Sequence, residues 1–527
     1  MTLRLEADVA VVGSGFGGSL AALALRRSGR SVALLERGRH PRFAIGESST
    51  PLANLLLEEL ADRYGLPRVR ALSKWGTWRR AHPDVACGLK RGFSFFAHPD
   101  GGLRPLLVAA SPHDEVGDTH WYRPDVDHFL VREAVAAGAL YLDQSALETV
   151  RVDDERATLE GHRLGRPLQV DARFVIDASG PRGFLHRALG LPERRLVGLP
   201  PTQGLYAHFT DVERVDRLAP VAGAPYPVDD AALHHVFPGG WIWVLRFANG
   251  ITSAGVAATD ALAADLELSD GARAWERLLD RLPEVQRQFA RARATMPFVH
   301  SARLSFRSAT VCGPRWALLP SAAGVVDPLL STGFPLNLLG LGRLLELFEG
   351  DPPWDKALAE YARHTQDELD ATERLVGALY AVMQDFELFK RMTLLYFAAA
   401  SYSETVRRLG RPEKARGFLL HADPAFGPAL AACCDAAARK PQGRERDDLL
   451  VRIDEAIAPF DVAGLGDRSR GDFHPVLADD LRRAAAKLDA REAEIEALLE
   501  RCFGPASAPH ASAARGAVRP SDGSAAP

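Results

Sequence analysis

The chain has 527 residues, with 64 Lys and Arg against 68 Asp and Glu, which gives a formal net charge of −4. This length allows two or more domains with substantial cores, and the balanced charge without a basic block argues against a nucleic-acid partner. The five cysteines form no C-x-x-C pair, which argues against a structural zinc site and a disulfide framework and favours a reducing, cytoplasmic compartment.

The first predicted element is a nucleotide-binding unit of strand, glycine loop, helix and second strand. Residues 9–12 form a short apolar run typical of a buried parallel strand, and a helix is predicted from near Ser19. The G-x-G-x-x-G loop permits a tight turn, close approach of a pyrophosphate to the backbone and close helix packing. An acid at the end of the second strand suits the adenosine ribose hydroxyls. The predicted cofactor-binding residues here are Gly13, Ser14, Gly15, Gly18, Glu36 and Arg37.

Several later segments follow this unit in a characteristic order. "IGESSTP" comes after the second strand, Arg123 and Asp127 precede a predicted helix, "ARFVIDASG" is a predicted strand, and a D-P-x-x-S-x-G loop runs into a long apolar helix that Gly333 opens. Over about residues 5 to 350 this order resembles the flavin monooxygenase and halogenase superfamily. The resemblance implies an α/β fold: a Rossmann-like FAD-binding domain, an inserted β-sheet substrate domain and a C-terminal helical region.

The expected organisation is interleaved. Residues 1–350 hold the FAD domain together with a substrate-facing sheet from about 85–120 and 190–300. Aromatic and β-branched residues predict strands in "GLYAHFTDVERV" and in "LHHVFPGGWIWVLRF". Residues 351–503 read as helices, with one amphipathic helix over 477–503, and residues 504–527 read as a disordered tail.

Lys90, in "CGLKRGFSFF", matches the Lys-Arg-Gly segment of phenol-type halogenases. In that family, reduced FAD and oxygen convert a halide to hypohalous acid, which travels through a tunnel to a lysine beside the substrate. Lys90 is the predicted catalytic residue because "GFSFF" reads as a strand that could aim it inward. Lys74, in "ALSKWGTWRR", is the competing candidate, and a solvated surface lysine is the alternative to both.

Two further motifs support the resemblance. Trp241 and Trp243 match the W-x-W-x-I-P signature, whose indoles are thought to fill space near the flavin, although Leu245 and Arg246 replace Ile and Pro. The resemblance assigns flavin or halide contacts in the D-P-x-x-S-x-G loop to Asp327, Pro328, Ser331, Thr332 and Gly333.

Two departures affect the function expected. Pro320 and Ser321 replace the usual Gly-Asp upstream of this loop. Leu330 stands where tryptophan-type members carry a glutamate, which favours a phenol or pyrrole substrate.

The sequence therefore predicts halogenation, with chloride or bromide, of an electron-rich aromatic natural-product intermediate that arrives free or bound to a carrier protein. A single nucleotide fingerprint predicts a separate flavin reductase as partner. No metal or membrane is expected: adjacent His234 and His235 would point to opposite faces of a strand, and no apolar run is long enough to span a bilayer. A monooxygenase or reductase on the same scaffold and a non-catalytic flavoprotein are the alternatives.

Overall fold

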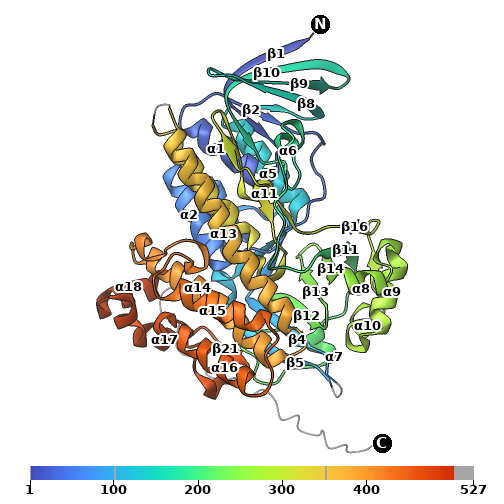
Figure 1. The fold of residues 1–527 in the computed structure, drawn as a ribbon, viewed down its shortest axis with the longest axis vertical. Helices are drawn as coiled ribbons and strands as arrows, with labels where there is room; N and C mark the ends of the chain where they lie inside the picture. The colour runs from blue at the N-terminus through green and yellow to red at the C-terminus, as the bar shows by residue number, and fades with distance from the viewer. Residues whose placement is uncertain (1, 100–101, 351–352, 504–527) are drawn as a thin grey trace, which may run out of the picture.

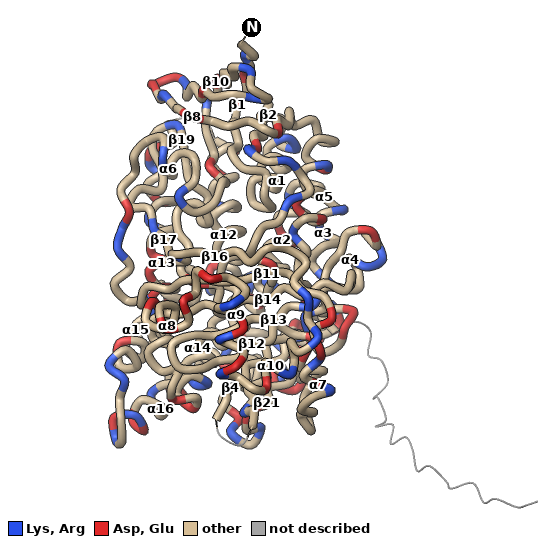
Figure 2. Tube along the Cα trace, turned by 90° about the vertical axis from the view of Figure 1, so that its right-hand side faces the viewer, with Lys and Arg blue, Asp and Glu red and all other residues tan. Residues whose placement is uncertain are grey.

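The computed structural model describes residues 2–99, 102–350 and 353–503, so the tail predicted for residues 504–527 lies outside the described residues. Figure 1 shows a first sheet at one end of the molecule and, at the other, a second sheet beside the C-terminal helices. Helix α13 (Asp355–Val382) runs between the two ends. Figure 2 shows basic and acidic residues interspersed over the face in view.

The first sheet has the order β18-β19-β10-β1-β2-β7. Its parallel strands are β1 (Leu3–Val12), β2 (Val32–Leu35), β7 (Leu140–Leu142), β10 (Arg166–Asp177) and β19 (Trp316–Leu318). Antiparallel strands extend it: β8 (Ser145–Val152), β9 (Ala157–Arg163) and β18 (Cys312–Gly313). Because β1 pairs with both β2 and β10 up to Val12, the loops that follow these three strands meet at one edge. That edge is where open α/β sheets bind ligands.

Two helices beside this sheet begin at other residues than the sequence predicted. The helix predicted from near Ser19 is α1 (Phe16–Arg27), which begins one turn earlier and packs on β1 and β2. Arg123 and Asp127 do not precede their helix, as predicted, but lie in its first turns, since α5 spans Arg123–Ala136. Pro at the second helical position suits this start because its missing N–H has no intrahelical acceptor there.

The second sheet has the order β15-β11-β14-β13-β12-β4-β5-β21, with β16 also paired to β11. The strands predicted in residues 204–246 are confirmed as β11 (Thr202–Thr210), β12 (Ala232–Phe237) and β13 (Gly240–Arg246). The other strands are β4 (Gly92–Ala97), β5 (Arg104–Ala109), β14 (Thr252–Thr259), β15 (Arg293–Ala294), β16 (Val299–Ser301) and β21 (Phe473–His474). The last strand comes from the C-terminal region, which sequence patterns did not predict to join a sheet.

The two faces of this sheet pack against different partners. Ile242 and Val244 belong to a core that also contains Ala263 of α8 (Asp260–Asp265), Trp275 of α9 (Ala272–Asp280) and Val285 of α10 (Pro283–Phe289). Trp241 and Trp243 alternate with them and belong to the main core. This alternation aims the two indoles toward the interior of the molecule.

Several short elements lie outside the two sheets. Lys90 ends β3 (Cys87–Lys90), which pairs with β6 (Asp118–Trp121), and Gly92 begins the separate strand β4. The strand predicted for "GFSFF" is therefore confirmed as β4, and Lys90, which precedes it, is the last residue of β3 and is buried. Other short elements are α3 (Pro67–Arg70), α4 (Trp75–Ala81), α6 (Phe184–Ala188), α7 (Val215–Leu218), α11 (Pro320–Ala323), β17 (Phe306–Arg307) and β20 (Gly324–Val325).

The predicted helical character of the C-terminal region is confirmed. After α12 (Gly333–Leu347) come α13, α14 (Phe386–Arg408), α15 (Phe426–Ala438) and α16 (Gly443–Ile457), with α2 (Pro51–Arg63) packed on α12 and α14. The single helix predicted over 477–503 is wrong: α17 (Ala478–Arg483) and α18 (Glu492–Phe503) flank a break at Asp489, which has a left-handed φ of 50°. None of the described helices combines the length and apolar character needed to cross a bilayer.

The docking of α13 gives a stability prediction. A Cβ on Gly377 would lie 1.8 Å from the backbone oxygen of Gly198, so Gly377→Ala must displace backbone and should destabilise the protein by about 1–3 kcal/mol. Gly342, inside α12, has open space around it, so Gly342→Ala is the control and should stabilise the protein by up to about 1 kcal/mol. Thermal unfolding of the two variants checks this, and equal midpoints would contradict it.

Candidate active site

The three glycines of the first loop have distinct surroundings. Gly13 has a φ of +98°, and a Cβ on Gly18 would lie 1.9 Å from the Gly13 oxygen, so both positions require glycine. A Cβ on Gly15 would instead meet side chains, with Arg123 Nη2 at 3.5 Å and Arg42 Nη2 at 4.0 Å. Gly15 therefore opens into a space at the N-terminus of α1 that is bordered by two guanidinium groups and by the Asp127 carboxylate at 3.8 Å, which itself pairs with Arg123. The helix N-terminus and the two guanidinium groups suit an anion such as a diphosphate.

Glu36 at the end of β2 is buried and closes this loop. Its carboxylate accepts hydrogen bonds from Ser14 N and Oγ, at 3.1 and 2.9 Å, from Gly38 N at 2.8 Å and from Arg42 at 3.0 Å. Burial alone would raise the pKa of Glu36, but Arg42 and these N–H groups lower it to about 2. The carboxylate is thus ionised at neutral pH. Arg37, predicted here, is exposed, and the sequence analysis missed Arg42.

Arg123 joins the glycine loop to the segment before α2. It pairs with Asp127 through two hydrogen bonds of 2.8 Å each and donates to the backbone oxygens of Ile45 and Gly46 at 2.9 and 2.8 Å. Such charge-assisted, bidentate contacts fix geometry as well as adding energy. Together, the glycine cradle, the two arginines and the Glu36 carboxylate fit the diphosphate and ribose of FAD.

The D-P-x-x-S-x-G loop contains two strained residues. Leu330 and Ser331 have φ values of 66° and 55°, a left-handed conformation that costs non-glycine residues energy. Asp327 holds the turn, because its Oδ1 accepts from Leu329 N at 3.0 Å. Gly333 begins α12, whose first N–H groups have no intrahelical acceptor. The loop therefore presents amide groups to which an anion can bind.

The two tryptophans of β13 lie close together, with ring centroids 5.7 Å apart, and both are buried. Trp243 Nε1 donates to Ser253 Oγ at 3.3 Å, and Trp241 Nε1 donates to Tyr380 Oη at 3.1 Å. Tyr380, on α13, is a residue of this region that the sequence analysis missed.

The departures from the family signatures have local explanations. The Arg246 side chain forms an ion pair with the buried Asp229, with Nη2 and Oδ1 2.7 Å apart, and does not contribute to the tryptophan pair. Ser321 does not offer its hydroxyl to a described partner, but its backbone N–H donates to Asn337 Oδ1 at 3.2 Å. Neither change removes an indole or alters the Asp327 turn.

Lys90 is fully buried rather than solvated. Its Nζ donates to Ser48 Oγ at 2.9 Å and to the backbone oxygen of Ser49 at 2.5 Å, and it lies 3.8 Å from the centroid of the Phe93 ring. Burial lowers the pKa of Lys90 below its ordinary value, although the Asp118 carboxylate, its partner in the β3–β6 pairing, raises it. A lowered pKa favours the neutral amine, which is the form that reacts with an electrophilic halogen.

Asp118 is held beside Lys90. Asn54 Nδ2 donates to Asp118 Oδ1 at 2.7 Å, whereas Oδ2 is buried without a hydrogen-bond partner among the described residues. Burial raises the pKa of Asp118, against the effects of Lys74 and Lys90.

A cavity of about 710 Å³ lies between α2, α4, β4, β5, α14 and the C-terminal segments. Phe93, Tyr396 and Phe397 form an aromatic part of its wall, and their rings contact one another edge to face. Lys74 lines the cavity, whereas Lys90 does not and lies behind the Phe93 ring. The cavity is thus an apolar space with charged side chains such as Arg80 and Arg407 also on its wall.

Comparisons with known proteins identify the family. The tryptophan halogenase model matches residues 120–391, and the model of an NAD(P)-binding Rossmann-like domain matches residues 11–52. The chain is 28% identical over 411 residues to tetracycline 7-halogenase of Kitasatospora aureofaciens, covering 75% of this chain and 73% of that protein. It is 28% identical over 399 residues to monodechloroaminopyrrolnitrin halogenase PrnC of Pseudomonas fluorescens, covering 72% and 69%.

Solved structures share the fold. The halogenase PltM in complex with phloroglucinol and FAD superimposes with a TM-score of 0.78 at 25% identity, covering 89% of this chain and 99% of that one. The flavin-dependent brominase Bmp2 superimposes with a TM-score of 0.60 at 21% identity, covering 82% and 98%. At that identity Bmp2 is informative about the fold alone.

The open side of Gly15 gives a binding prediction. Gly15→Val places a side chain where the diphosphate must lie, so the purified variant should fail to bind FAD. Gly342→Val, in open space on α12, is the control and should bind FAD normally. Titration of the apoprotein with FAD, followed by fluorescence, measures both, and wild-type affinity in Gly15→Val would show that FAD binds elsewhere.

Proposed function

Because the chain belongs to the tryptophan halogenase family and is a flavin-dependent halogenase, we propose that it chlorinates an electron-rich phenolic ring beside Lys90. The family, the FAD cofactor and the requirement for oxygen and halide agree with the sequence prediction. The monooxygenase, reductase and non-catalytic alternatives lose their main support, since the departures at Arg246 and Ser321 leave the tryptophan pair and the Asp327 turn in place.

The proposed reaction divides between two places in the structure. Reduced FAD, when bound, supplies one electron pair to oxygen and the halide supplies the other, which gives hypohalous acid, water and oxidised FAD. The proposed halide site lies at Ser331–Gly333, where the amide groups of Thr332 and Gly333 can bind an anion without offering a group that hypohalite oxidises. The Ser331 N–H is already used, since it donates to the Pro328 oxygen at 3.1 Å. Trp241 and Trp243 would shield this region with rigid indoles.

The single observation that carries the role of Lys90 is its buried, doubly fixed amine beside the aromatic wall of the cavity. An amine held by Ser48 and Ser49 can retain hypohalous acid through a hydrogen bond or an N–halogen bond, which prevents its diffusion into solvent. The halogen then passes to the ring, the ring proton leaves, and water is released. Passage from Lys90 to the cavity requires movement of the Phe93 side chain.

The substrate class follows from the chemistry of the cavity. Its wall is aromatic at Phe93, Tyr396 and Phe397, and Leu330 is buried where a glutamate would serve a tryptophan substrate. The related PltM structure holds phloroglucinol, an electron-rich phenol. Relatives that act on carrier-bound pyrroles make a carrier-tethered substrate the alternative to a free one. Bromide is the alternative halide.

We place the protein in the cytoplasm with a separate flavin reductase as partner. All five cysteines are free thiols, as a reducing compartment favours. The sequence contains one G-x-G-x-x-G fingerprint, and we assign that loop to FAD. No second fingerprint of this kind is left in the sequence to bind NAD(P)H.

Replacement of Lys90 tests its role. Lys90→Met keeps the length and apolar part of the side chain but removes the amine, so halogenated product per FADH2 oxidised should fall by about 100-fold or more. Lys90→Arg should fail as well, because it keeps the charge but loses the primary amine. Product formation from phloroglucinol with FAD, a reductase and chloride measures this.

Lys74→Met is the matched comparison for Lys90. Lys74 lines the cavity, so its loss should alter the KM for the aromatic substrate while the yield of halogenated product per FADH2 is retained. If Lys74→Met loses that yield and Lys90→Met does not, the catalytic lysine is Lys74. Hydroxylated product from the wild type would overturn the halogenase proposal itself.

The electron supply is tested with the purified protein. We expect negligible NADPH or NADH oxidation by the FAD-loaded protein alone, and halogenation once a flavin reductase is added. Rapid reduction of the bound flavin by NADPH without a reductase would contradict the proposed partner.

A further inference from the structure

Three buried side chains from distant parts of the chain form one hydrogen-bonded series. Trp241 Nε1 on β13 donates to Tyr380 Oη on α13 at 3.1 Å, and Tyr380 Oη donates to Asp327 Oδ2 at 2.9 Å. Their exposed fractions are 1%, 7% and 3%, so water does not compete for these bonds. The tryptophan motif, the C-terminal helices and the D-P-x-x-S-x-G loop are therefore joined through a single phenol group.

Asp327 transmits this series to the strained turn. Its second oxygen, Oδ1, accepts from Leu329 N at 3.0 Å, directly before Leu330 and Ser331 in the left-handed conformation. No cation lies within ion-pair distance of Asp327 among the described residues, and burial raises its pKa to about 6. A buried carboxyl without a cation depends on its hydrogen bonds. The Tyr380 hydroxyl donates to Oδ2, and the Trp241 indole also lies near enough to lower the pKa of Asp327.

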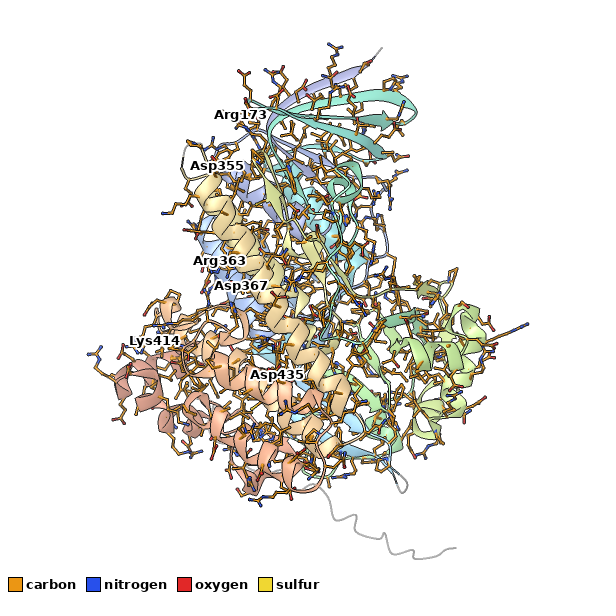
Figure 3. The ribbon with its side chains drawn as sticks, viewed as in Figure 1. Arg173, Asp355, Arg363, Asp367, Lys414 and Asp435 are labelled. Carbon is orange, nitrogen blue, oxygen red and sulfur yellow. The ribbon has the colours of Figure 1, made fainter. Side chains whose placement is uncertain are left out.

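Helix α13 makes a second, separate contact of the same kind. Tyr361 Oη donates to the backbone oxygen of Leu318 in β19 at 2.6 Å and is also buried. By the helical rise, Tyr361 and Tyr380 lie about 28 Å apart along the axis. Figure 3 labels Asp355, Arg363 and Asp367 along the same helix, and these side chains are on its solvent side. Tyr361 thus attaches one end of α13 to the first sheet, and Tyr380 attaches the other end to the D-P-x-x-S-x-G loop.

We propose that Tyr380 is a positioning residue of the halide site, which orients Asp327 and through it the amide groups of Thr332 and Gly333. This inference rests on the proposed function, since those amides are the proposed halide ligands. Trp241 orients the Tyr380 hydroxyl. The indole N–H donates to the Tyr380 oxygen, so the phenolic hydrogen is directed to Asp327. The C-terminal helical region then contributes to halide binding as well as to the substrate cavity.

Tyr380→Phe tests the inference because it removes only the hydroxyl. We expect the chloride KM to rise about tenfold, as for loss of a hydrogen bond to a charged group, with little change in kcat at saturating chloride or in FAD affinity. Trp241→Phe should raise the chloride KM less, and it serves as a second variant if Tyr380→Phe folds poorly. The assay uses the FAD-loaded full chain with a reductase, phloroglucinol and sodium chloride.

Tyr361→Phe is the matched control, since it removes a buried hydroxyl from the same helix. It should lower the thermal midpoint without changing the chloride KM. Asp327→Asn combined with Tyr380→Phe should be no worse for chloride than the more severe single variant, because both act on one series. Quenching of flavin fluorescence by sodium chloride in the FAD-loaded protein gives the halide affinity without turnover.

The outcomes separate this inference from the proposed function. A wild type that halogenates, with a raised chloride KM and weaker chloride quenching in Tyr380→Phe, supports both. A wild type that halogenates while Tyr380→Phe keeps the chloride KM within twofold overturns the inference alone, as does an equal rise in Tyr361→Phe. A wild type that neither halogenates nor responds to chloride or bromide overturns the proposed function and the inference with it.

Discussion

The parallel pairing of β1 with β10 is the constraint on which the rest of the structure depends. It joins Val12 to Asp177 at one edge of the first sheet and so brings the glycine loop beside the return strand of the same domain. The close contacts at Gly13 and Gly18 leave no room for side chains there, while Gly15 remains open toward Arg42 and Arg123. The proposed diphosphate site depends on this contrast: Gly13 and Gly18 contact other backbone atoms, whereas Gly15 faces side chains that include two guanidinium groups.

The second constraint is the long helix α13, which touches both ends of the molecule. Tyr361 binds the backbone of the first sheet and Tyr380 binds the loop before α12. The next helix, α14, supplies Tyr396 and Phe397 to the cavity wall. One helical hairpin therefore connects the proposed halide loop to the proposed substrate space, although the two are formed by segments far apart in sequence.

The proposed chemistry depends on burial as much as on residue type. Lys90 ends a short strand, and the bonds of its Nζ to Ser48 and Ser49 and the Phe93 ring keep it from solvent. The same amine on the surface would have an ordinary pKa and no means to retain a diffusible oxidant. The β3–β6 register places Asp118 opposite Lys90.

The sequence by itself determined the elements whose signals are local: the glycine loop and Glu36, the strand that carries Trp241 and Trp243, and the helix that opens at Gly333. Turn chemistry and hydrophobic period depend on near neighbours, so they can be seen in one segment. Only the tertiary structure decided that Arg42 pairs with Glu36, that residues 473–474 join the second sheet, and that Tyr380 bonds to Asp327. Each of these depends on contacts between segments whose spacing along the chain carries no pattern, because packing and not periodicity brings them together.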